Sequence, residues 1–70
     1  MQAKVIFIGQ KVYHKQIYDG KELMEIVPQT YGEAIEHYPW LECEPHEWDN
    51  RSTIENAIYL IRELLKKANY

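Results

Sequence analysis

Residues 52–68, STIENAIYLIRELLKKA, decide the fold because they carry a complete code for one amphipathic helix. At about 100° per residue, their apolar side chains fall within an arc of roughly 120°, and polar side chains fill the opposite side. The apolar side consists of Ile54, Ala57, Ile58, Ile61, Leu64, Leu65 and Ala68, with Leu60 beside it. The polar side consists of Glu55, Asn56, Tyr59, Arg62, Glu63, Lys66 and Lys67.

Both ends of this segment carry helix signals. Ser52 and Glu55 have the spacing of a capping box, in which a hydroxyl and a carboxylate each accept a backbone N–H at the helix start. Lys66 and Lys67 lie where the helix dipole favours cations. We therefore predict a helix over residues 53–68 that packs its apolar face on the rest of the chain.

Length and cysteine content limit the class of protein. A chain of 70 residues is expected to form one domain, residues 1–70, with a core that contributes only a few kcal/mol net. Cys43 is its only cysteine, so a disulfide within the chain is excluded and a reducing, cytoplasmic location is expected. The first ten residues, MQAKVIFIGQ, hold too short an apolar run for a membrane span and lack a signal-peptide cleavage pattern. We expect a mature, soluble chain that does not enter a membrane.

The net charge of −3 is unevenly distributed. Residues 22–50 hold eight acidic residues and no lysine or arginine, whereas the cations lie in the flanking segments. Nucleic-acid binding needs a dense patch of lysine and arginine, so we do not expect it here. Mimicry of nucleic-acid charge by the acidic segment is an alternative that this distribution leaves open.

The first 27 residues predict an antiparallel sheet of two or three strands within residues 4–27. Lys4–Ile8 (KVIFI) has no polar alternation, which is typical of a strand that is apolar on both faces rather than a solvent-facing edge. Gly9 and Gln10 fit a two-residue hairpin loop, or alternatively Gly9 forms a bulge in one long strand.

The strongest turn signal is Asp19-Gly20, because a type I′ turn needs positive φ at both central residues. The resulting hairpin places His14 opposite Glu25 and leaves apolar residues on both of its faces. Pro28 ends the second strand because it has no amide hydrogen to donate.

The middle of the chain predicts a short helix followed by a loop. Thr30 and Glu33 repeat the capping-box spacing, so residues 31–38 form a two-turn helix that Pro39 closes. Its inward side would hold Ala34, Ile35 and Tyr38. For residues 39–50 we expect an ordered loop or a short strand at residues 40–44, since two tryptophans argue against a disordered linker.

Metal binding and catalysis have few candidate residues. Cys43, His46 and His37, with His14, give a ligand set that zinc accepts, but structural zinc sites use two close ligand pairs and this chain has one. We therefore assign no metal, keep a metal-stabilised domain as an alternative, and interpret Cys43 as a small buried hydrophobe.

Cys43 beside His46 and Glu47 is the only candidate nucleophile, and closeness along the chain does not activate a thiol. We predict a protein that is not an enzyme and binds no cofactor.

The acidic, aromatic segment 31–49 is the candidate functional site. Tryptophan and tyrosine often dominate binding energy, and surrounding carboxylates steer a basic partner toward them. The segment therefore predicts a protein-interaction module that binds another protein with a basic surface. The candidate partner-binding residues are Tyr31, Tyr38, Trp40, Glu42, Glu44, Glu47 and Trp48. The alternative is that the tryptophans close a small core and the acids are its solvated rim.

The stretches DGKELMEIVP, residues 19–28, and TIENAIYLIRELL, residues 53–65, resemble small antitoxins of the HicB type. In that family a strand-rich half is followed by a helix that packs on the sheet. The resemblance implies an alternative function, the neutralisation or inhibition of a small toxin protein.

These observations together predict the α+β class and self-association. One helix can bury one sheet face, yet Lys4–Ile8 and the hairpin have apolar residues on both faces. Leaving several such side chains in water forfeits about as much free energy as the whole stability expected of a small domain. We therefore expect a homodimer, through either the sheet faces or the edge strands. The alternative is a monomer in which residues 31–48 fold back over the second face.

Overall fold

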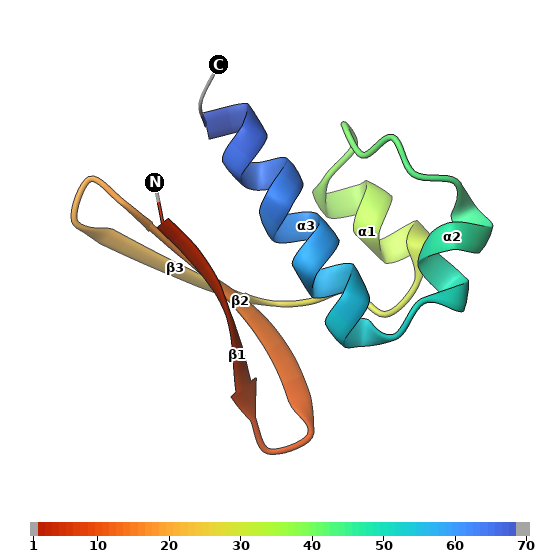
Figure 1. The fold of residues 1–70 in the computed structure, drawn as a ribbon, viewed down its shortest axis with the longest axis horizontal. Helices are drawn as coiled ribbons and strands as arrows, with labels where there is room; N and C mark the ends of the chain where they lie inside the picture. Colours follow the sequence, from red (N-terminus) through yellow and green to blue (C-terminus); the bar gives the residue numbers. More distant parts are fainter. Residues whose placement is uncertain (1, 69–70) are drawn as a thin grey trace.

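The computed structural model describes residues 2–68, in which three antiparallel strands are followed by three helices (Figure 1). This arrangement confirms the predicted α+β class, the sheet and the long C-terminal helix. The elements are β1 (Gln2–Ile8), β2 (Lys11–Tyr18), β3 (Lys21–Ile26), α1 (Tyr31–His37), α2 (Pro45–Asn50) and α3 (Thr53–Ala68).

The sheet is a meander in the order β1-β2-β3, joined by two tight hairpins. Ile8 pairs with Lys11, so Gly9 and Gln10 form a two-residue loop and not a bulge, with Gly9 at φ 62°. Asp19 and Gly20 both have positive φ, 52° and 77°, as a type I′ turn requires. His14 pairs with Glu25, which confirms the register predicted for the second hairpin.

The interpretation of the first strand as a non-edge strand is wrong. Both connections are two-residue hairpins, which join neighbouring strands, so β2 lies in the middle and β1 lies at an edge. Phe7 and Ile8 near its end are 57% and 51% exposed. The apolar character of β1 therefore does not reflect burial on both faces within one chain.

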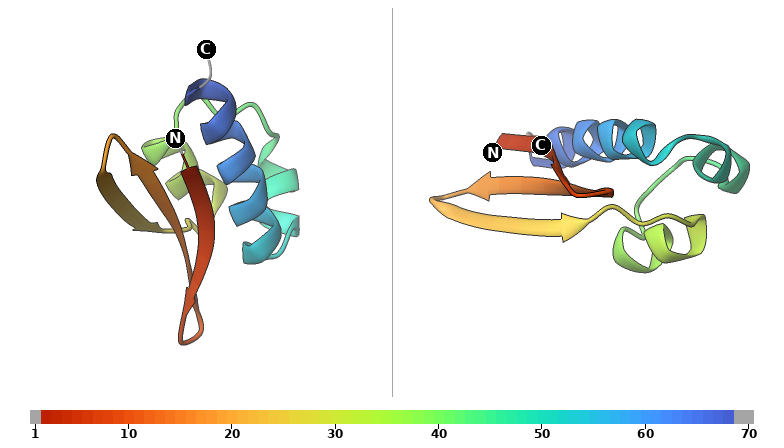
Figure 2. Two further views of the ribbon diagram at one scale, coloured as in Figure 1. Left: turned by 60° about the vertical axis from the view of Figure 1, so that its left-hand side comes forward. Right: turned by 90° about the horizontal axis from the view of Figure 1, so that it is seen from below.

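The helices cover only one face of the sheet. The core joins Val12 and Val27 of this covered face to Trp48 of α2 and Leu60 of α3. In the right panel of Figure 2, α3 lies on the side of β1 and α1 lies near the end of β3. We call the other side of the sheet the open face; by the strand register its apolar residues are Ile6, Ile8, Tyr13, Ile17, Met24 and Ile26. Residues 31–48 do not fold over this face.

The first helix follows the prediction closely. Helix α1 begins after Thr30, whose hydroxyl accepts the Glu33 amide hydrogen at 3.2 Å. Ala34 is fully buried, Ile35 packs against the core, and Tyr38 directly after the helix is 7% exposed. The predicted inward side is therefore confirmed.

The prediction of a loop or strand over residues 39–50 is wrong in its second half, where α2 forms. Pro45 occupies the first turn of this helix, where its missing N–H and fixed φ cost nothing. The Glu44 amide donates to Glu47 Oε1 at 3.2 Å, which fixes the helix start. The helix buries Trp48 completely, so a six-residue helix is stabilised by tertiary contact.

Helix α3 has the predicted bounds and cap, but it is rotated relative to the predicted face. Ser52 and Glu55 exchange both capping-box hydrogen bonds, each 3.2 Å long. Asn56, predicted on the polar side, is 2% exposed, because α2 covers that side of the helix. Ile54 and Ile58, predicted to be covered, are 46% and 43% exposed. Within residues 2–68, no helix is both long and apolar enough to cross a membrane.

Candidate functional site

The acidic residues predicted as the interaction surface are all exposed on the layer formed by α1, α2 and their connections. Glu33 and Glu36 lie on α1, Glu42 and Glu44 lie between the helices, and Glu47 lies on α2. We call these five residues, together with Asp49, the acidic layer. No lysine or arginine occurs between residues 22 and 50, so no cation from these elements lies among them.

The aromatic residues of the segment are placed differently from its acids. Trp48 is completely buried and Tyr38 is 7% exposed, so both serve the core. Tyr31 is half-buried and its backbone N–H donates to Asp49 Oδ1 at 3.0 Å, which ties the start of α1 to α2. Trp48, Tyr38 and the backbone of Tyr31 therefore hold the acidic layer in place.

Trp40, like Tyr31, is partly buried and packs against the core. Its ring meets Tyr38 edge-on, with the ring centroids 5.8 Å apart. Lys67 of α3 lies over the ring, with Nζ 4.8 Å from its centroid. The ring therefore already makes a cation–π contact within the chain.

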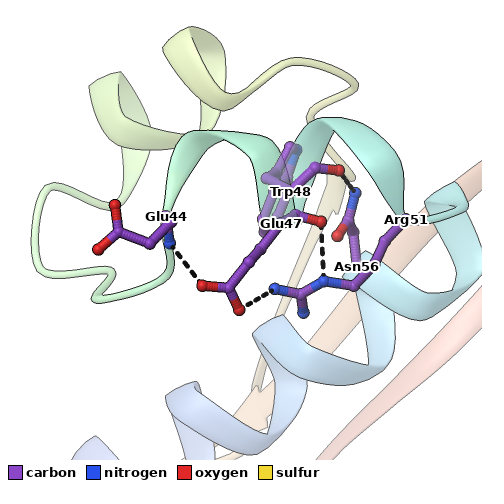
Figure 3. Close-up of polar contacts among 5 residues, drawn as sticks. All are labelled: Glu44, Glu47, Trp48, Arg51 and Asn56. Carbon is purple, nitrogen blue, oxygen red and sulfur yellow. Dashed lines mark hydrogen bonds and ion pairs between the residues drawn. The ribbon is translucent and has the colours of Figure 1, made fainter.

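Polar contacts fix the end of α2 and tie it to α3 (Figure 3). Arg51 Nε donates to the Glu47 carbonyl oxygen at 2.9 Å, and its Nη2 lies 3.4 Å from Glu47 Oε2. Asn56 Nδ2 donates to the carbonyl oxygen of Trp48 at 2.9 Å, which satisfies a backbone acceptor at the end of α2. Of the acidic layer, Glu44, Glu47 and Asp49 therefore carry structural roles.

The remaining carboxylates of the acidic layer make no ion pair within residues 2–68. They are Glu33, Glu36 and Glu42. Glu42 lies near the C-terminal half of α3, lining a surface depression with Trp40, Glu63, Lys66 and Lys67. Glu33 and Glu36 lie one turn apart on the outer side of α1. These three residues hold the negative charge that is accessible to a partner.

A second cluster, which the sequence revealed only in part, joins the sheet to the helical layer. His14 of β2 is completely buried, and its Nε2 lies 2.7 Å from Tyr38 Oη. The Tyr38 hydroxyl donates to Glu25 Oε2 of β3 at 2.8 Å, and Gln16 Nε2 lies 3.4 Å from His14 Nδ1. One arrangement satisfies all of these contacts: a neutral His14 that donates from Nε2 and accepts at Nδ1.

Burial sets the protonation of this cluster. Desolvation lowers the pKa of His14, and the nearby Glu25 carboxylate opposes this shift only in part. Desolvation also raises the pKa of the Tyr38 phenol, and its hydrogen bond to Glu25 adds to the rise. His14 and Glu25, 3.7 Å apart, are therefore coupled through a neutral tyrosine and not through an ion pair. The sequence predicted that His14 faces Glu25 but not that Tyr38, 24 residues away, lies between them.

The other candidate residues do not assemble into a reactive site. Within residues 2–68, no group of three or more His, Cys, Asp or Glu side chains could hold a metal, so Cys43, His46 and His37 do not form the zinc site considered from the sequence. Cys43 is buried at 8% exposure, in agreement with its interpretation as a small core residue. The structure gives no support to the metal-stabilised alternative.

The fold and the surface together define a small α+β protein with an acidic helical layer on one side of a three-stranded sheet. Comparisons with protein-family models, with curated proteins and with solved structures found no match to this chain. The resemblance to HicB-type antitoxins stays a prediction.

Proposed function

We propose that this protein is a non-enzymatic protein-interaction module that binds a basic surface of another protein through its acidic layer. One observation carries the proposal: three accessible carboxylates, those of Glu33, Glu36 and Glu42, lie without ion-pair partners within residues 2–68. Natural surfaces usually intersperse both charge signs, whereas α1, α2 and their connections contribute no lysine or arginine, and the cations beside them come from Arg51 and the end of α3.

The rigidity of the layer supports this proposal. Trp48 and Tyr38 anchor it in the core, and the hydrogen bonds of Tyr31 and Glu47 fix the ends of its helices. A preorganised charged surface loses little conformational entropy when a partner binds. Its field also accelerates the encounter with an oppositely charged surface.

The test uses charge reversal with a matched control. The variant Glu36→Lys/Glu42→Lys reverses two carboxylates of the acidic layer. The control Gln10→Lys/Glu22→Lys/Gln29→Lys makes the same change in net charge at exposed positions of the sheet and its connections. Tagged wild-type protein and both variants are used to capture partners from an extract of the native host, with bound proteins quantified by mass spectrometry. We expect a basic protein that the wild type and the control retain and that the Glu36/Glu42 variant loses.

Salt dependence provides the second readout. Raising the salt concentration from about 0.1 M to about 0.5 M shortens the screening length by roughly half. We expect recovery of the partner to fall by at least tenfold over this range. Equal recovery by the Glu36/Glu42 variant and the wild type, with both shown to be folded by circular dichroism, would contradict the proposal.

A further inference from the structure

Of the two edge strands of the sheet in the described part of the chain, β1 carries the fewer charges. Its seven residues, QAKVIFI, contain a single charge, that of Lys4. The other edge strand, β3, carries Lys21, Glu22 and Glu25 within six residues. Charged residues are the usual protection of an edge strand against pairing with another chain. Strand β3 has this protection and β1 does not.

The register shows which groups of β1 are unpaired. The Val27 amide donates to the Val12 carbonyl oxygen at 3.0 Å, so the backbone N–H and C=O groups of Val12 in the central strand point toward β3. In an antiparallel sheet the backbone groups of successive residues point to opposite sides of the strand, so those of Lys11 and Tyr13 point toward β1. They pair with Ile8 and Ile6. The backbone N–H and C=O groups that point away from the sheet are therefore those of Ala3, Val5 and Phe7.

The exposed side chains near the end of this strand are also apolar. Phe7 and Ile8 of β1 are 57% and 51% exposed. Figure 2 shows α3 on the β1 side of the molecule and α1 on the β3 side.

We propose that two copies of this chain pair through β1 around a two-fold axis at Val5, which joins their sheets into one of six strands. In this register Val5 faces Val5 of the other copy. Phe7 faces Ala3 of the other copy, so the large ring meets a small side chain. All the outward N–H and C=O groups of Ala3, Val5 and Phe7 then form hydrogen bonds. Lys4 faces Ile6, so no like charges lie opposite each other.

The spacing of the elements agrees with this arrangement. Helix α3 contacts both β1 and β2, so it lies above the gap between them. Neighbouring strands are about 4.8 Å apart, which places the two α3 helices of the dimer about 10 Å apart and antiparallel. Packed helices lie about 8–10 Å apart.

The exposed area also fits a second copy. A compact monomer of 8.4 kDa is expected to expose about 4,600 Å². This chain exposes 5020 Å², an excess of about 400 Å². Burying that excess on each copy removes about 800 Å² in total, which is typical of a weak, reversible association.

The open face of the sheet is a poorer interface between two copies. Its charged residues are Lys4, Lys11, Lys15 and Glu22, by the strand register. Face-to-face pairing brings together two surfaces that each carry excess positive charge, which costs free energy. Pairing through β1 leaves these lysines in water.

Amide hydrogen exchange tests the proposal directly. In NMR experiments at about 10 μM and about 1 mM protein, we expect the amides of Ala3, Val5 and Phe7 to become at least tenfold more protected at the higher concentration. The amides of Lys4 and Ile6, already bonded to β2, serve as internal controls. Protection that appears instead along β3, or no change in the three amides, would overturn the β1 interface.

Sedimentation equilibrium with two matched variants provides an independent test. Phe7→Glu replaces the ring that faces Ala3 of the other copy with a charge, whereas Met24→Glu places a charge on the open face; the two side chains are 57% and 48% exposed. We expect Met24→Glu to dimerise like the wild type and Phe7→Glu to stay near 8.4 kDa. A wild-type mass near 8.4 kDa at 1 mM, or loss of the dimer in Met24→Glu alone, refutes the proposal.

Discussion

Removing the Tyr38 hydroxyl is predicted to destabilise the protein strongly, although only one oxygen atom is lost. In Tyr38→Phe, His14 Nε2 loses its partner at 2.7 Å inside a completely buried site. An unsatisfied buried donor costs about 1–3 kcal/mol. Glu25 also loses a hydrogen bond, but its side chain is 40% exposed and water replaces the donor.

We therefore expect the free energy of unfolding to fall by about 2 kcal/mol. For a domain of this size, that change lowers the melting temperature by about 8–16 °C. The measurement is urea unfolding at pH 7.5 and one fixed, low protein concentration, followed by tryptophan fluorescence, since Trp48 is buried in the core.

Tyr31→Phe is the matched control, because Tyr31 belongs to the same helix and its hydroxyl makes no hydrogen bond within residues 2–68. It should change stability by less than about 0.5 kcal/mol. Adding His14→Leu to Tyr38→Phe should recover part of the loss, since removing both partners leaves no unsatisfied donor. If Tyr38→Phe is as stable as Tyr31→Phe, the argument that this buried hydrogen bond links sheet and helices is refuted.

Three further outcomes follow from the packing. Burial lowers the pKa of His14, so the unfolded chain binds the proton more tightly. Stability should therefore be fully present above pH 6.5 and fall below it, at up to about 1.4 kcal/mol per pH unit. His14→Gln should flatten this slope in urea unfolding, and an unchanged slope would contradict the assignment to His14. Leu60→Ala truncates a completely buried side chain of α3 and should lower the free energy of unfolding by about 2–5 kcal/mol in the same measurement. A loss below about 1 kcal/mol would contradict the central place of Leu60 in the core. Gly32→Ala should stabilise helix α1 by about 0.5–1 kcal/mol, because nothing lies within 4 Å of the added Cβ. Gly20→Ala should destabilise the protein by about 1–2 kcal/mol, because the φ of Gly20 is +77°. Thermal melts in which both variants shift the melting temperature in the same direction would contradict this prediction.

The elements with local signals could be predicted from the sequence. The two-residue turns needed glycine at Gly9 and Gly20, and both turns formed where those residues stand. The capping boxes and apolar spacing marked the starts of α1 and α3. Helix α2 was missed because six residues give too little periodicity, although Pro45 with Glu44 and Glu47 carried a recognisable start signal.

The candidate site could be predicted only as far as its charge. The run without lysine or arginine located the acidic layer, and its carboxylates are exposed as expected. The sequence placed Tyr38 both on the inward side of the first helix and among the partner-binding residues, and it left open whether the tryptophans close the core. The contacts of Tyr38 with the sheet and of α2 with α3 showed that Tyr38 and Trp48 are core residues.

The sequence by itself determined where the chain turns, where its helices begin and which segment is acidic, because these depend on contacts between residues a few positions apart. Tertiary structure alone decided which side of each element is covered. It rotated α3 so that Asn56 is buried and Ile58 is exposed, and it inserted Tyr38 between His14 and Glu25. The physical reason is that burial depends on what packs against a surface, and that neighbour comes from a distant part of the chain.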